Sequence, residues 1–171
     1  MSEYIVEPVS RQNLRDYAYQ IRENLKCEND LYFPIVEFWE ALPEIFVDYT
    51  FEIIDDNEVP FNVHGYTDVS NKKVCIKNSV YEGADAGNGR DRMTMAHEIS
   101  HFLMLGISEY RFERNFSGRP VYAFEDPEWQ AKCMAGELLV PHHLISGMTP
   151  NEISKLCGVS VAAAKEQLKH I

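Results

Sequence analysis

Two histidines and a glutamate occupy a short stretch whose spacing can hold a metal ion. His97, Glu98 and His101 form the pattern H-E-x-x-H. Four residues along a helix correspond to about 400° of rotation and about 6 Å of rise, so the two imidazoles share one face. Imidazole nitrogens are common zinc ligands, and a carboxylate beside them can take a proton from water. The pattern therefore predicts that His97 and His101 bind zinc and that Glu98 is a general base.

A catalytic zinc site needs a third protein ligand and keeps one coordination position open. Glu128 is the preferred candidate, because the alanines at 131 and 135 would let its helix approach the histidine-bearing helix closely. We expect one zinc ion per chain, held by His97, His101 and Glu128. The alternatives for the third ligand are Glu125, Asp126, Glu137, His64, His142 and His143.

The composition restricts the partners and the compartment. Twenty-seven acidic and sixteen basic residues give a net charge of −11, which disfavours direct binding to nucleic acid. Neither a signal peptide nor a membrane-spanning segment is visible, so we expect a cytoplasmic protein without membrane contact. Four widely spaced cysteines are expected to be reduced and mostly buried: Cys27, Cys75, Cys133 and Cys157.

The elements that must position these residues can be read from the hydrophobic pattern. An amphipathic helix is predicted over about 10–25, and a second follows Pro34 and ends at Pro43. Strands are predicted at 49–54, 61–66 and 73–77, forming a small, mainly antiparallel sheet. Three glycines, at 83, 87 and 89, predict a loop before the next helix.

The histidines lie on a helix predicted over 91–105, with Gly106 as its stop. Asp126 is expected to cap the helix that carries Glu128, with Pro127 at its first position and Pro141 marking its end. Two short helices, opening after Thr149-Pro150 and at Ser160, complete a helix-turn-helix-like pattern. The expected fold class is α+β in a single domain, 1–171. Its parts are N-terminal helices (1–48), the sheet and zinc-site helices (49–147) and the helix-turn-helix-like tail (148–171).

Two linked motifs carry a family resemblance. Residues 92–101, RMTMAHEISH, and residues 128–141, EWQAKCMAGELLVP, together resemble the ImmA/IrrE metallopeptidases, and the likeness is clear over 73–141. The resemblance implies a minimal zincin-like fold with His97, His101 and Glu128 as ligands and Glu98 as base. It also implies a bacterial, phage or mobile-element peptidase that cleaves a helix-turn-helix transcriptional repressor.

The chain departs from the usual pattern of that family at two places. Gly106 stands where a histidine is frequent, and Lys132-Cys133-Met134 replaces the more usual Asn or Asp, variable residue, Phe. Neither departure removes a proposed ligand.

Several roles remain open at the level of sequence. Tyr81, Tyr110 and Arg92 are candidates for stabilising the oxyanion of a peptidase reaction. The strand at 73–77, taken as an edge strand, is expected to align an extended substrate by strand addition.

Two other functions compete with the peptidase. The tail could mark a DNA-binding regulator, but 149–171 carries three lysines against two glutamates, only one net positive charge. The second alternative is a zinc-containing regulatory module that binds a repressor or toxin partner without cutting it. Glu98 argues against that module, because a structural zinc has no use for a carboxylate beside its first histidine.

Overall fold

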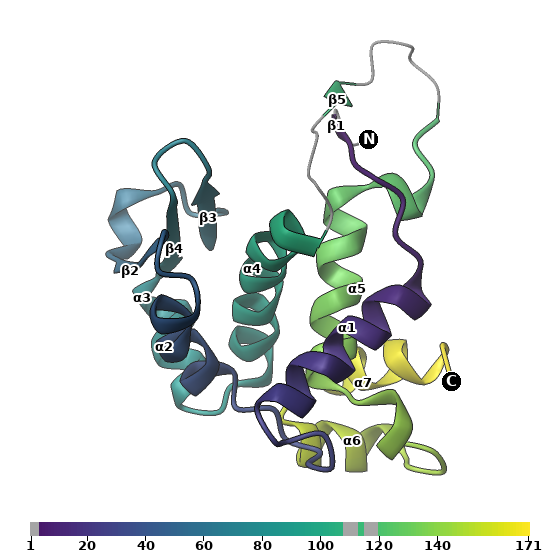
Figure 1. Ribbon diagram of the computed structural model, residues 1–171. Coiled ribbons are helices and arrows are strands. Elements are labelled where there is room, and N and C mark those ends of the chain that lie inside the picture. Colours follow the sequence, from purple (N-terminus) through teal and green to yellow (C-terminus); the bar gives the residue numbers. More distant parts are fainter. Residues whose placement is uncertain (1–3, 108–112, 115–119) are drawn as a thin grey trace.

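The computed structural model describes residues 4–107, 113–114 and 120–171, and within these ranges the fold is α+β. Two helices, α4 (Gly89–Ile107) and α5 (Pro127–Leu139), run side by side through the middle of the molecule (Figure 1). The sheet lies on the side of α4 opposite to α5, together with α2 (Ile35–Ile45) and α3 (Asn78–Asp85). Helix α1 (Arg11–Asn24) packs on α5.

The central position of α5 follows from its sequence. Ten of its thirteen residues are buried, so the helix needs neighbours on nearly every side. Ala131 and Ala135 are fully buried, as the expected close approach of the two ligand helices requires. Asp126 caps the helix, because its side chain accepts a hydrogen bond from the N–H of Glu128, and Pro127 occupies the first turn. The predicted start of this helix is confirmed.

The three-stranded sheet is mixed. Its order is β2 (Thr50–Ile54), β4 (Lys73–Lys77), β3 (Gly65–Asp68). Of the expected, mainly antiparallel pairings, that of β3 with β4 is present, as a hairpin, whereas β2 runs parallel to β4. After β2 the chain passes through a 3-10 turn, Asp56–Glu58, to the far side of β4 before it turns back. The alternation of apolar and polar residues within a strand does not indicate which strands are neighbours in the sheet.

This topology changes which strand is exposed at the sheet edge. Lys73–Lys77, expected at the edge, is the central strand, and four of its five residues are buried. The strand predicted at 61–66 begins only at Gly65 and runs to Asp68. β3 is therefore the edge strand next to α4.

Two helix ends and one whole helix also differ from the sequence prediction. Pro43 lies inside α2, in its last turn, where the missing N–H costs a single intrahelical bond and Phe46 closes the helix end on the carbonyl of Leu42. Helix α3 replaces the expected loop, because Gly83 packs against Asp91 of α4 where a Cβ would collide. Helix α4 continues through Gly106, which is exposed, to Ile107.

The two short helices predicted for the tail are present. α6 (Pro150–Cys157) and α7 (Val161–Leu168) are capped by Thr149 and Ser160. Gly158 joins them with a φ of 66°, a left-handed conformation that glycine adopts at little cost. A short antiparallel pair, β1 (Tyr4–Ile5) with β5 (Glu113–Arg114), was not predicted, since two residues give no readable period.

One hydrophobic core contains residues from all three predicted parts of the chain, from Val9 to Ala164. The four cysteines are free and buried within it or beside it, as expected. Among the described residues, no helix is both long and apolar enough to cross a membrane.

A buried arginine ties the tail to the histidine-bearing helix. Arg92 of α4 is 1% exposed and donates hydrogen bonds to the carbonyls of Phe33, Cys157 and Gly158 and to the hydroxyl of Tyr32. Two of these carbonyls belong to the C-terminal end of α6 and its cap, where a positive charge is favourable. The guanidinium therefore holds α6 against the start of α4.

We predict that Arg92→Met lowers the free energy of unfolding by at least about 3 kcal/mol, because several buried acceptors lose their donor and each costs about 1–3 kcal/mol. Chemical denaturation of the zinc-free protein measures the change. Arg90→Met is the matched control on the same helix, since Arg90 is exposed and its loss should stay within about 0.5 kcal/mol. Equal stabilities for the two variants would contradict this account of Arg92.

Candidate metal centre

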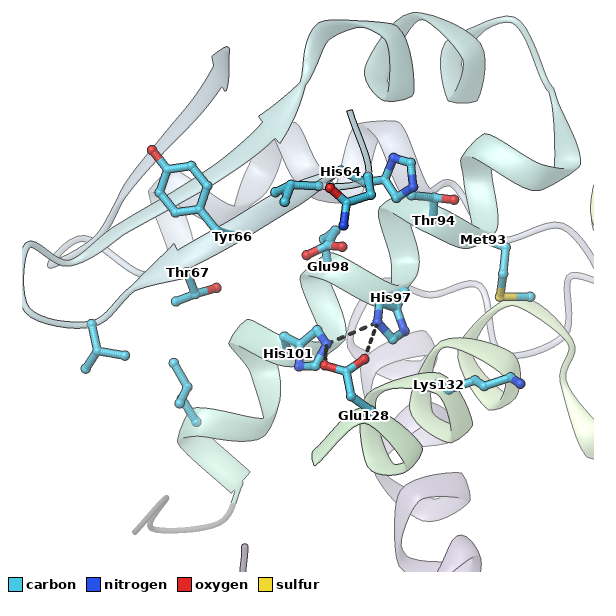
Figure 2. A pocket seen from close by; sticks show the side chains of 15 residues that line it. His64, Tyr66, Thr67, Met93, Thr94, His97, Glu98, His101, Glu128 and Lys132 are labelled. Atoms are coloured by element: carbon cyan, nitrogen blue, oxygen red, sulfur yellow. Dashed lines mark hydrogen bonds and ion pairs between the residues drawn. The ribbon is translucent and has the colours of Figure 1, made fainter. Parts of the chain in front are cut away.

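The structure brings His97, His101 and Glu128 together across the contact between α4 and α5 (Figure 2). The Nε2 atom of His97 lies 3.3 Å from Oε2 of Glu128, and Nε2 of His101 lies 3.2 Å from Oε1. The two Nε2 atoms are 3.1 Å apart. Hydrogen bonds from His101 and His97 hold the pKa of Glu128 well below its usual range.

These three separations fit a tetrahedral zinc site. Zinc binds histidine nitrogen and carboxylate oxygen at about 2.0–2.2 Å, so two ligand atoms of a tetrahedron lie about 3.3 Å apart. The observed distances of 3.1, 3.2 and 3.3 Å agree with that spacing. The donor set of two imidazoles and one carboxylate also suits zinc and leaves a fourth position free. Elsewhere in the described ranges no second group of such residues is close enough to hold a metal.

Glu98 lies beside the three ligands but does not belong to the cluster. Burial raises its pKa to about 7; the nearby His97 opposes the rise and Glu128 adds to it. A carboxyl group with this pKa can both accept and return a proton near neutral pH. The role expected for Glu98 therefore fits its surroundings.

Gly65, the first residue of β3, permits the close approach of the sheet to Glu98. A Cβ at this position would lie 2.6 Å from the carbonyl oxygen of Cys75 and 3.0 Å from Cγ of Glu98. Real Cβ atoms do not approach other atoms at the first of these distances. Glycine is thus required where the edge strand meets the candidate base.

His97, His101 and Glu128 line a cleft of about 690 Å³ between α4, α5 and the edge strand. Its second wall consists of the loop before β3 and β3 itself, including His64, Tyr66 and Thr67 (Figure 2). Buried Lys77 holds this loop by donating to the carbonyls of Pro60 and Phe61, at 2.9 and 3.2 Å. Apart from His64, sequence reasoning missed this wall. The sequence did contain one signal: Gly65 interrupts a run of alternating apolar and polar residues, and such a glycine often marks a place where another part of the chain approaches the backbone closely.

The other candidates for the third ligand lie outside the cluster. Asp126 is the helix cap, and Glu125 hydrogen-bonds the backbone of Tyr122. Glu137 is buried and paired with Arg11 at 3.0 Å and Arg15 at 2.9 Å. The three histidines are also accounted for: His64 lines the cleft without joining the three-ligand group, and His142 and His143 lie in the 3-10 turn His142–Leu144 after α5.

Two of the three candidates for oxyanion stabilisation do not line the cleft. Arg92 is buried at the interface with α6, and the hydroxyl of Tyr81 donates to Glu40 at 2.6 Å. That hydrogen bond raises the pKa of Tyr81 to about 12. The third candidate, Tyr110, lies outside the described residues.

Comparison with known proteins shows a shared fold. No family model matches this sequence, and no curated protein is detectably similar to it. A solved structure described as a Mycobacterium tuberculosis transcriptional regulator is similar, with a TM-score of 0.59 and 11% sequence identity. The alignment covers 92% of this chain but 46% of that one, so this chain spans about half the length of the regulator. At this identity the likeness concerns the fold alone.

We predict that Glu128→Ala weakens zinc binding by more than about 100-fold, since loss of a direct ligand exceeds the cost of losing a residue that only orients one. Zinc per chain, measured after purification without chelator or metal-affinity resin, should fall from near one to well below one. His64→Ala is the matched control, because it removes an imidazole from the same cleft but not from the three-ligand group. If the control lost zinc and Glu128→Ala kept it, the ligand assignment would be wrong.

Proposed function

We propose that this chain is a zinc-dependent endopeptidase with a minimal zincin-like fold, related to the ImmA/IrrE metallopeptidases. The observation that carries the proposal is the convergence of His97, His101, Glu128 and Glu98 in one open cleft. The first three provide the ligand set of a hydrolytic zinc site, and the fourth provides a base beside it. The H-E-x-x-H motif and the motif around Glu128 support the same family.

The chain supplies the parts that peptide hydrolysis needs. Zinc held by the three ligands would polarise the scissile carbonyl and lower the pKa of the attacking water. Glu98, whose pKa lies at about 7, would remove a proton from that water and deliver it to the leaving amine. Glu98 thus transfers one proton from the water to the leaving amine and ends in its initial ionisation state.

The edge strand offers a way to hold an extended substrate. β3 pairs with β4 on one side only, and its residues line the cleft. A peptide that adds to the free edge of β3 would run past the ligand cluster in extended form. This role replaces the one expected for Lys73–Lys77, which the sheet order excludes because β4 is central.

The proposed substrate is a helix-turn-helix transcriptional repressor whose cleavage relieves repression in a bacterium, phage or mobile element. This part of the proposal rests on the family resemblance. The small number of lysines on the tail supports contact with protein in preference to DNA. A repressor gene next to the gene of this protein would supply the substrate for a direct test.

We predict that the Glu98→Gln variant keeps near one zinc per chain. It should cleave a repressor encoded by an adjacent gene about 10²–10⁴ times more slowly than the wild type, because this is the usual contribution of a general base. Rates are followed by gel and the products identified by mass spectrometry, with equal metal loading of both proteins.

The Glu98→Gln variant also distinguishes the peptidase from the main alternative function. A zinc-containing module that binds the repressor without cutting it would need no base. If Glu98→Gln relieved repression in cells as fully as the wild type, that alternative would replace the peptidase.

A further inference from the structure

A second, smaller pocket opens next to the candidate metal centre. Its volume is about 170 Å³, and its walls come from α1, α4, α5 and α7. Met93 and Lys132 line both this pocket and the metal-site cleft. The two cavities are therefore adjacent, with these two side chains between them.

Helix geometry places this pocket one turn away from the ligands. Met93 precedes His97 by four residues on α4, and Lys132 follows Glu128 by four residues on α5. The two helices run in opposite directions (Figure 1), so both steps lead to the same side, about 6 Å along the helix axes. Figure 2 shows Met93 and Lys132 on one side of the ligand cluster and the edge-strand residues Tyr66 and Thr67 on the other.

The walls of the pocket are mainly apolar. Trp129, Met93, Cys133 and Ala163 line it, and Trp129 is half-buried there. Burial raises the pKa of the Cys133 thiol to about 12, so this group is neutral.

Most charged groups at the rim already have partners. Arg11 is paired with Glu137 at 3.0 Å, and Glu166 with Lys169 at 2.7 Å. Among the described residues, no hydrogen bond or ion pair involves the ammonium group of Lys132. The pocket thus combines an apolar interior with one available cation at its mouth.

The size of the pocket limits what it can hold. Cavities that bind whole small molecules usually measure about 300–1,000 Å³. A volume of about 170 Å³ suits one side chain, not a longer segment. Because the pocket shares Met93 and Lys132 with the cleft, a molecule bound across the candidate metal centre can place one side chain in it.

We propose that this pocket binds one large apolar side chain of the substrate, close to the scissile bond, and so sets the cleavage specificity. The inference rests on the proposed peptidase function and gives the tail a role in it. Ala163, Glu166 and Gln167 of α7 line the pocket, so the tail helix forms part of a substrate site. Gln167 is fixed there against Gly136 of α5, where a Cβ would collide with its amide.

The test measures binding of three short peptide hydroxamates to the zinc-loaded protein. The compounds carry a leucine, glycine or aspartate side chain next to the zinc-binding hydroxamate and are otherwise identical. Tryptophan fluorescence reports occupancy, because Trp129 lines the pocket, whereas Trp39 is buried against Phe51 in the core. Trp129→Phe identifies the part of the signal that comes from the pocket.

We expect the leucine compound to bind about 10–200-fold more tightly than the glycine compound and to change the emission of Trp129. Ala163→Phe, which fills the pocket, should reduce this preference to about threefold or less. Ala162→Phe is the matched control on the exposed side of α7 and should leave it unchanged. The wild-type fluorescence response needs no variant, so the test survives if Ala163→Phe folds poorly.

Two outcomes overturn the pocket assignment while the peptidase proposal stands. In the first, all three compounds bind with similar affinity and Trp129 does not respond. In the second, the aspartate compound binds best, which would make Lys132 the recognition element in place of the apolar walls. If none of the hydroxamates binds zinc-loaded protein, the proposed function fails and this inference fails with it.

Discussion

The contact between α4 and α5 is the constraint on which the candidate centre depends. His97 and His101 share one helix, so their separation is fixed by helix geometry. The carboxylate of Glu128 comes from a different helix and reaches them only because α5 lies against α4. Most of α5 is buried, so apolar packing and small alanines, not the ligands, keep it there. The geometry for the metal is therefore set by the core.

Sequence reasoning found the two helices that carry His97, His101 and Glu128, because their signals are local. H-E-x-x-H predicts a shared helix face, and Asp126-Pro127 predicts where the next helix begins. The sheet was predicted less well, since the order of its strands depends on where the chain crosses between them. The parallel pairing of β2 with β4, and the edge position of β3, follow from that crossing.

The missed helix and the misplaced helix ends all involve residues that disfavour helices. Gly83 and Gly106 are poor helix residues on average, and Pro43 lacks an N–H, yet all three lie within helices. Gly83 provides space for Asp91, and Pro43 lies in a last turn that needs few hydrogen bonds. Packing against Asp91 thus accounts for Gly83, whereas Gly106 is exposed and, within the described ranges, has no neighbouring atom that explains why α4 continues through it. The wall of the cleft around Gly65 was missed likewise, because its partner Glu98 is 33 residues away.

The three clustered side chains are open to solvent: that of Glu128 is 66% exposed, and those of His97 and His101 are 26% and 25% exposed. If the cluster holds zinc as proposed, folding of the core would not depend on the metal, unlike in small domains that unfold without zinc. The ion would enter or leave through the open cleft while the core stays intact. The fraction of protein that carries zinc would then depend on the free zinc concentration. It could change in either direction without new synthesis or degradation of the polypeptide.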